Sequence, residues 1–361
     1  MKIRDRYITK TLLTYTFVVL LVWLSIYSFF NFLAELNNVG SQSYTVLEAF
    51  KYVIFQMPEV AYNQASPIIL LGCLLGMGHL ATTSQLLIFN ISGTSILKVT
   101  WLVIKSALFF VITIIVIGEL IAPILSNYAE NNRSNALGFE TTTKSQEGFW
   151  IRDGDNFINV ENNIDGKLFS GITIIEVDGL NKIKRVVNSE NASFDGGSLN
   201  MVASEIFTIN SSGIFENISL KERNFYNKTV SFDQDLIASL EKEPEDLTSW
   251  TIIKQIQFLS DNKLRSGIFE VELYKRLIKP ITLIAMIVLA MLFIFASTTR
   301  DSTLGRKIFF GVTLGLLFEM LSRLGGAISL GFDISPLLSS IMPSIVVLLI
   351  SVALLLRKSL R

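Results

Sequence analysis

Residues 99–122 read VTWLVIKSALFFVITIIVIGELIA, and this stretch decides the class of fold. Only Lys105 and Glu119 carry a charge within it. A helix needs about 20 apolar residues to cross a hydrocarbon core of roughly 30 Å. In lipid the backbone must also satisfy its own hydrogen bonds, which favours a helix. The stretch is therefore predicted to span a membrane.

Five further stretches meet the same criterion, so six spans are predicted. The other five are Thr11–Phe30, Tyr62–Ala81, Ile281–Ser297, Ile308–Leu321 extended toward Leu330, and Leu337–Leu356. The composition agrees, because 50% of the 361 residues are hydrophobic and only 17% are charged. The first stretch is about twice as long as a signal-peptide core of 7–15 residues, so we expect a retained helix.

Basic residues in the short loops predict the orientation of the spans. Lys and Arg gather in segments 1–10, 82–98, 298–307 and 357–361. The opposite loops, 31–57 and 322–336, hold only Lys51 and Arg323. We therefore expect a multi-pass protein with both termini in the cytoplasm and segment 82–98 on the same side.

A polar insert separates the third and fourth spans and is expected on the far side of the membrane. The predicted domains are transmembrane residues 1–123, the insert 124–279, and transmembrane residues 280–361. The first two thirds of the insert alternate apolar and polar residues, as in NFINV (156–160) and SGITIIEV (170–177), with turn formers between the runs. This pattern predicts an antiparallel β sandwich or open barrel.

The last third of the insert has a helical pattern. Thr248 or Ser249 is a possible N-cap, and Ile252, Ile256 and Leu259 follow at helical spacing. A second helical stretch then leads into the fourth span. A helical connection is therefore predicted between the β region and the membrane.

Signatures of enzymatic chemistry are missing from the sequence. The chain has no phosphate-binding loop G-x-x-x-x-G-K-[ST], and no G-x-S-x-G, H-E-x-x-H or C-x-x-C motif. The single Cys73 excludes an intrachain disulfide, and the single His79 lacks partners for a metal site. We expect no catalytic, cofactor or metal site, no ATP hydrolysis by this chain, and no nucleic-acid partner.

Two acidic residues within the apolar spans are candidate functional groups, because ionisable groups are costly in a membrane. Glu119 lies in IGELIAP, where the alternative is that its carboxylate reaches water at the interface. Glu319 precedes Arg323 by four residues, so the two side chains can pair on one helix face.

Segment 82–98, TTSQLLIFNISGTSILK, is nearly uncharged and has an apolar middle. Thr82, Thr83 and Ser84 are good helix N-caps, Gly93 is a good helix stop, and Thr94 and Ser95 can cap the next span. A short surface helix is predicted between them. Its apolar side chains contact either the membrane interface or the groove of a partner protein.

Several of these segments together resemble the LptF/LptG family of permease subunits. They are DRYITKTLL (5–13), PIILLGCLLGMGHLATTSQLLIFNISG (67–93), IGELIAP (117–123), EGFWIRDGDNFINV (147–160) and the closing spans. The resemblance covers essentially the whole chain, and the Asp5-Arg6-Tyr7-Ile8 start is more similar to the LptG branch.

The resemblance implies a membrane fold of three plus three helices with an inserted periplasmic β-jellyroll. It also implies a bacterial inner-membrane subunit that extracts lipopolysaccharide and passes it to a periplasmic bridge. The implied partners are an LptF-like sister subunit, an LptB-like cytoplasmic ATPase dimer that hydrolyses ATP, and an LptC-like single-span protein. The first, second and fifth spans would line a cavity for acyl chains.

The resemblance also assigns roles to particular residues. The segment from about 84 to 93 would be a coupling helix that contacts the ATPase through Ser84, Gln85, Leu86, Ile88, Phe89 and Gly93. Gln85 departs from the family, which usually has glutamate there. Asn31, Asn37 and Asn38 stand at the outer end of the first span, where members often carry lysines thought to meet lipid phosphates.

Four cations are candidate phosphate ligands in place of those lysines, because Lys and Arg are the usual phosphate donors. They are Lys275, Arg276, Lys279 and Arg323. The alternative is that they pair with Glu270, Glu272 and Glu319. Two other functions stay open: a permease subunit of another lipid or lipoprotein exporter, and a membrane-bound lipid-modifying enzyme that uses Glu119 or Glu319 as a proton carrier.

Overall fold

The computed structural model describes residues 3–86, 88, 94–138, 149–163, 167–178, 182–212, 215–232, 236, 243–296, 304–332 and 334–359. The chain divides into two compact units. A helical unit comprises Met1–Val39, Val46–Glu130 and Glu270–Arg361, and a β unit comprises Gly40–Thr45 and Asn131–Phe269.

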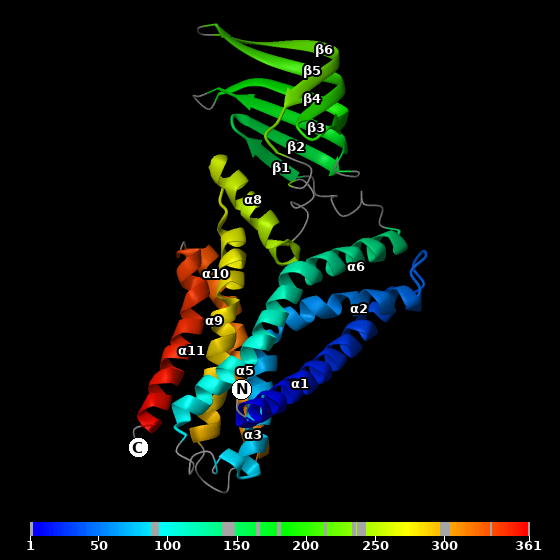
Figure 1. Cartoon of the computed structure of the whole chain (residues 1–361). Helices are drawn as coiled ribbons and strands as arrows, with labels where there is room; N and C mark the ends of the chain where they lie inside the picture. The colour runs from blue at the N-terminus through cyan, green and yellow to red at the C-terminus, as the bar shows by residue number, and fades with distance from the viewer. Residues whose placement is uncertain are drawn as a thin grey trace. The chain divides into compact units, whose positions relative to one another are not determined.

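Six helices in the described part of the chain are long and apolar enough to cross a membrane, which confirms the predicted number. They run over Asp5–Asn38, Ala65–Thr82, Ile96–Ala136, Gly267–Phe295, Phe309–Phe332 and Pro336–Lys358. The corresponding elements in Figure 1 are α1 (Ile3–Glu35), α3 (Ala65–Thr82), α5 (Ile96–Val116), α9 (Gly267–Ala296), α10 (Leu304–Phe332) and α11 (Pro336–Ser359).

One helix lies where the sequence pattern predicted a loop. Helix α2 (Val46–Asn63) occupies much of the segment between the first two spans. It carries Glu48, Lys51 and Glu59 and an internal Pro58, so its pattern falls short of a membrane span. The second span accordingly begins at Ala65 and not at Tyr62.

The third span continues beyond its predicted end at Ala122. A π-helical turn, η2 (Ile117–Ile121), follows α5 and leads into α6 (Ala122–Ala136). Such turns occur mostly as single insertions within α-helices and often mark functional sites. Here the turn holds Glu119.

Helix α3 is the packing centre of the helical unit. Its residues from Ala65 to Leu74 are all buried. Gly72 lets α1 approach, since a Cβ there would lie 2.6 Å from the Cα of Thr16. On α10, a Cβ at Gly311 would lie 2.1 Å from Leu74. Small residues thus bring α1 and α10 close to α3, as is common between membrane helices.

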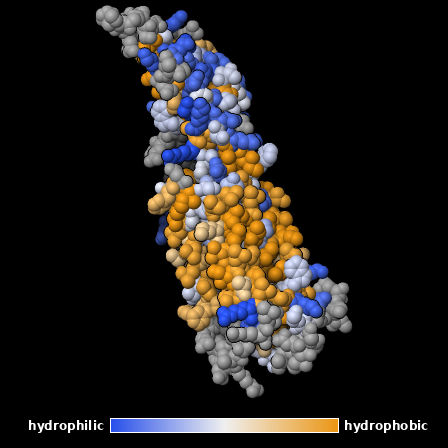
Figure 2. All heavy atoms as spheres, turned by 90° about the vertical axis from the view of Figure 1, so that its left-hand side faces the viewer, coloured by the Kyte–Doolittle hydropathy of each residue, from blue (hydrophilic) through white to orange (hydrophobic). Residues whose placement is uncertain are grey.

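The outward face of the helical unit is apolar. Large exposed hydrophobic side chains lie on α1, α10 and α11, including Phe17, Val22, Phe30, Leu321, Met342 and Leu349. Figure 2 shows hydrophobic residues covering the face of this unit that is turned to the viewer. An apolar surface of this extent indicates contact with lipid or with another membrane subunit.

The described residues of the β unit form one antiparallel sheet, whose six strands follow one another in chain order (Figure 1). The strands are β1 (Phe149–Asp153), β2 (Asn156–Asn163), β3 (Leu168–Val177), β4 (Ile183–Phe194), β5 (Ser198–Ser212) and β6 (Phe215–Thr229). The predicted antiparallel insert between the third and fourth spans is therefore confirmed. Within the described sheet, β1 and β6 are the edge strands.

One face of this sheet forms the core of the β unit. The register places Ile158 opposite Ile151 and Ile174, and Val187 opposite Ile174 and Ile206, so one apolar row crosses five strands. Helix α8 (Ser249–Asp261) packs Phe258 against this core. The Thr251 N–H donates to the Thr248 hydroxyl at 3.2 Å, which confirms the predicted N-cap.

An ionic cluster ties the two halves of the sheet together. Glu176 of β3 accepts a hydrogen bond from Lys228 of β6 at 2.7 Å and one from Tyr226 at 3.0 Å. Strands β4 and β5 lie between β3 and β6 in the sheet, so these contacts require the sheet to curl over its own core. Arg185 adds an ion pair to Glu176 at 3.7 Å.

The cluster makes the stability of the β unit dependent on pH. Partial burial favours a higher pKa for Glu176, but the hydrogen bonds from Lys228 and Tyr226 and the charges of Lys228 and Arg185 outweigh it and lower the pKa. Because the folded pKa lies below the unfolded value, the stabilisation is present above the unfolded pKa and is lost as the pH falls through the folded pKa.

We predict that Glu176→Gln lowers the free energy of unfolding by about 1 kcal/mol at pH 7, the usual order for a partly exposed ion pair. The difference in free energy of unfolding between the unchanged chain and Glu176→Gln should disappear as the pH falls and Glu176 becomes protonated. Denaturation of the full chain in detergent at several pH values measures this. A constant difference at every pH would contradict the assignment.

Candidate functional site

The end of α3 differs in detail from the sequence prediction. The hydroxyls of Thr82 and Thr83 donate to the His79 carbonyl at 3.0 and 2.8 Å, so they close α3 and do not cap the next helix. Ser84 follows in the left-handed region, with φ of 60°. Its carbonyl accepts the Ile88 N–H at 3.2 Å, which starts the next helical turn.

The side chains of this turn face opposite ways. Leu86 is buried in the core of the helical unit, whereas Ile88 is 62% exposed. The Oε1 atom of Gln85 is buried and makes no hydrogen bond within the structure as described. Phe89 and Gly93 lie outside the described residues. Ile88 is thus the coupling candidate that presents an apolar side chain outward.

The following span begins as predicted. Ser95 is its N-cap, because the Lys98 N–H donates to the Ser95 hydroxyl at 3.4 Å. The hydroxyl groups on the two sides of the candidate coupling segment therefore act in different ways. The hydroxyls of Thr82 and Thr83 close α3 before the segment. The hydroxyl of Ser95 caps the start of α5 after it.

The end of α1 carries asparagines that make hydrogen bonds within the chain, where the family was expected to carry lysines. Asn31 donates to the Gln56 side chain of α2 at 2.9 Å. Asn38 donates to Glu35 at 3.3 Å, and Asn37 is exposed. Asn31 therefore joins α1 to α2, and Asn38 joins the turn after α1 to the end of that helix.

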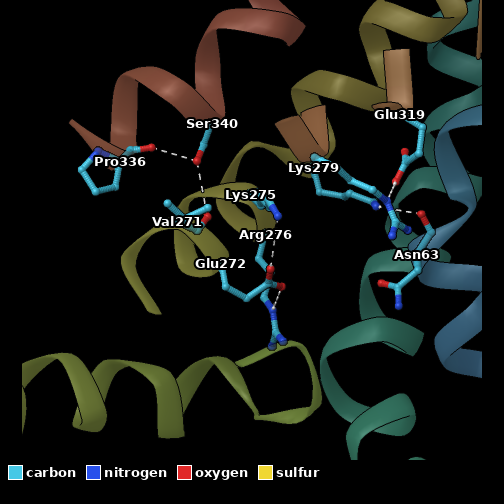
Figure 3. Close-up of polar contacts among 10 residues, drawn as sticks. Asn63, Val271, Glu272, Lys275, Arg276, Lys279, Glu319, Pro336 and Ser340 are labelled. Carbon is cyan, nitrogen blue, oxygen red and sulfur yellow. Dashed lines mark hydrogen bonds and ion pairs between the residues drawn. The ribbon is translucent and has the colours of Figure 1, made fainter. Parts of the chain in front are cut away.

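A charged cluster lies along the first half of α9 (Figure 3). The Nε atom of Arg276 lies 3.0 Å from Glu272 on the same helix. Its Nη1 atom lies 3.9 Å from Glu119 in η2. The Arg276 side chain is only 7% exposed, so its charge is neutralised inside the protein.

Lys279 also points inward. Its amine donates to the Asn63 carbonyl at 3.4 Å (Figure 3). The amine also lies 4.9 Å from the centre of the Tyr62 ring. A carbonyl and an aromatic face are both favourable partners for a buried ammonium. Sequence reasoning missed Tyr62 and Asn63, and the sequence holds no signal for them because Lys279 is 216 residues from Asn63.

The other two cations are more accessible. The Lys275 side chain is 29% exposed; its amine is 3.9 Å from Glu272 and close to Gly326 of α10. Arg323 is 64% exposed and pairs with Glu319 at 3.4 Å, as the four-residue spacing predicts. Exposed pairs of this kind are weak and exchange easily. Lys275 and Arg323 can therefore reach an external anion.

Lys275 and Arg323 also lie near each other. Gly326 is three residues beyond Arg323, so the two positions share a face of α10. Lys275 approaches that face from α9. The arrangement presents two reachable cations from neighbouring helices, whereas Arg276 and Lys279 serve internal contacts. Two cations so placed suit an anion with several oxygens, such as a phosphate.

Comparison with known proteins gives a consistent result. Residues 6–357 match the family model described as lipopolysaccharide export system permease LptF/LptG. The chain is 26% identical over 361 residues to the lipopolysaccharide export system permease protein LptG of Escherichia coli strain K12, covering 98% of each chain. It is also 26% identical over 356 residues to the protein of the same name from Haemophilus influenzae, again covering 98% of each chain.

Proposed function

We propose how this chain works in transport, given that it belongs to the lipopolysaccharide export permease family LptF/LptG. The chain is a permease subunit for lipopolysaccharide export. The observation that carries this conclusion is the match over residues 6–357, which includes all six apolar helices and the inserted antiparallel sheet. A permease for another lipid is not favoured, because the matched relatives share one function.

The energy for transport comes from separate cytoplasmic ATPase subunits in this proposal. The chain lacks a phosphate-binding loop, so it must receive the effect of ATP hydrolysis through a contact. The turn that carries Gln85 and Ile88 is our candidate, with Ile88 seated in an apolar groove of the ATPase and Gln85 adding a neutral hydrogen bond. This assignment places both termini in the cytoplasm.

The lipid contacts divide between apolar and charged surfaces. The exposed apolar faces of α1 and α10 suit acyl chains. Helix α3, which was expected to help line the cavity, is instead buried between α1 and α10. Lys275 and Arg323 are the proposed phosphate contacts, and the remaining surface of α1 is available to an LptF-like sister subunit.

The β unit receives the lipid on the periplasmic side in this proposal. Its described edge strands β1 and β6 carry unpaired backbone groups that can continue into another sheet. An LptC-like single-span protein and the sister subunit are the candidate partners. Continuity between β domains would give the lipid an uninterrupted surface.

The assembly test uses photo-crosslinking residues placed along 149–160 of β1 and β2 and along 226–229 of β6. We expect at least one edge to capture the LptC-like protein or the sister subunit in cells. The complex should also purify with an ATPase and with bound lipopolysaccharide. Capture of neither partner from either edge would overturn the handover part of the proposal, and absence of bound lipopolysaccharide would count against the function itself.

The coupling test replaces Ile88. We predict that Ile88→Asp lowers lipopolysaccharide transport by about tenfold, because a charge forced into an apolar groove loses its hydration. ATP hydrolysis by the assembled complex should continue. Ile88→Leu is the matched control and should transport normally. Unchanged transport by an assembled Ile88→Asp complex would contradict the coupling role.

The phosphate test replaces Arg323. Arg323→Lys should weaken transport in part, because an ammonium cannot make the bidentate contact of a guanidinium. Arg323→Glu should nearly abolish it. The competing explanation is a structural pair with Glu319, which predicts that Arg323→Glu combined with Glu319→Arg restores transport. Crosslinking to lipopolysaccharide and transport are measured in all three variants, and full rescue by the exchange would refute a lipid contact.

A further inference from the structure

Three separate elements of the helical unit meet at one polar contact. Tyr62 comes from the end of α2, Glu119 from the π turn η2, and Arg276 from α9. The Tyr62 hydroxyl donates to Glu119 at 3.3 Å, and the Arg276 guanidinium lies 3.9 Å from the same carboxylate. The contact therefore joins three elements that lie far apart along the chain.

The guanidinium of Arg276 is shared between two acids at different distances. Its closer partner, Glu272, lies on the same helix at 3.0 Å, and Glu119 lies on another element at 3.9 Å. A rigid structural link would place the short, strong contact between the two helices. Here the short contact is within α9, and the contact between helices is the long one.

Because Arg276 has a closer acidic partner on its own helix, its contact with Glu119 can break without leaving the guanidinium unpaired. Breaking a buried ion pair is usually costly, because it leaves a charge without a partner. If α9 moved away from η2, Arg276 would keep Glu272 and Glu119 would keep the Tyr62 hydroxyl. Both charges therefore have partners in the separated state as well as in the joined state.

The π turn is held on its other side by α2. Gly118 lies against the Tyr62 ring, and a Cβ at this position would come within 2.0 Å of the ring. Such close packing leaves little freedom between η2 and α2. The element that can separate is therefore α9.

A second cation of α9 faces the same surface. Lys279 lies one turn after Arg276 and contacts the Asn63 carbonyl and the Tyr62 ring of α2. The charges of Glu272 on α9 and Glu319 on α10 also act on the Lys279 ammonium in this structure. Arg276 and Lys279 therefore both hold α9 to the surface formed by α2 and η2.

We propose that the Arg276–Glu119 contact is a latch that holds α9 against the π turn in one state of the transport cycle and releases it in another. Arg276 is then a positioning residue for transport and not a phosphate ligand. The proposal rests on the transport function given above. By chain order, η2 leads through α6 into the β unit, and α9 follows directly from it, so the latch joins the two connections of that unit.

The decisive test joins the two elements covalently. In a Cys73→Ala chain within the full complex, Glu119→Cys and Arg276→Cys are linked by a bifunctional methanethiosulfonate reagent of matching span. Lipopolysaccharide release from proteoliposomes should fall by about tenfold on linking and return when a reductant cleaves the linker. Release by the linked complex at the unlinked level would overturn the proposal, because α9 would then never leave the π turn.

A second comparison covers the case in which the unlinked cysteine pair is inactive. Glu119→Gln weakens the contact between helices, and Glu272→Gln, the matched control, weakens the contact within α9. The latch predicts that only Glu119→Gln raises lipid-independent ATP hydrolysis and the ATP used per lipid released, by about fivefold. Equal changes in both variants, or a loss of thermal stability with an unchanged ratio, would overturn it. A wild-type complex that hydrolyses ATP but releases no lipopolysaccharide would instead refute the proposed function.

Discussion

The helical unit depends on one constraint, which is that a charge within apolar helices must keep a partner. Arg276 satisfies it with Glu272 and Glu119, and Lys279 with a backbone carbonyl and an aromatic ring. The cost of an unpaired ion in such surroundings exceeds that of most packing defects. These contacts therefore help to hold α2, η2 and α9 together.

The same constraint separates enclosed cations from accessible ones. All four candidate cations lie on α9 or α10, but two are enclosed and two remain accessible to an anion. An enclosed cation that changed partners would move the helix that carries it. An accessible cation exchanges a weak surface pair for a ligand at little cost, since exposed ion pairs contribute little. Lys275 and Arg323 are the proposed phosphate contacts for this reason.

The two units achieve close packing by different means. In the helical unit, glycines such as Gly72 and Gly311 allow helices to approach α3 where larger side chains would collide. In the β unit, an alternating apolar row fills the core, and the Glu176 cluster holds the curled sheet together. The helical unit thus presents an apolar exterior, and the β unit encloses an apolar core on one face of its sheet.

The sequence by itself determined the six spans, the antiparallel insert between the third and fourth of them, and the Glu319–Arg323 pair. It also placed the two caps to within one residue, at 94–95 and at 248–249. Each of these depends on local features: the length of an apolar run, a period of two, a capping hydroxyl, or a spacing of four residues. The resemblance to the family was also recognised from the sequence alone, through whole segments and not through single residues.

Only the tertiary structure decided which cations are enclosed, that α3 is buried, and that segment 46–63 forms a helix beside the spans. The partners that Arg276 and Lys279 find outside α9 come from α2 and η2, which are far away along the chain. Their meeting depends on how closely α3 and its neighbours pack. The physical reason is that desolvation and pairing of a charge are set by neighbours in space, and no local pattern around residues 275–279 records which neighbours those are.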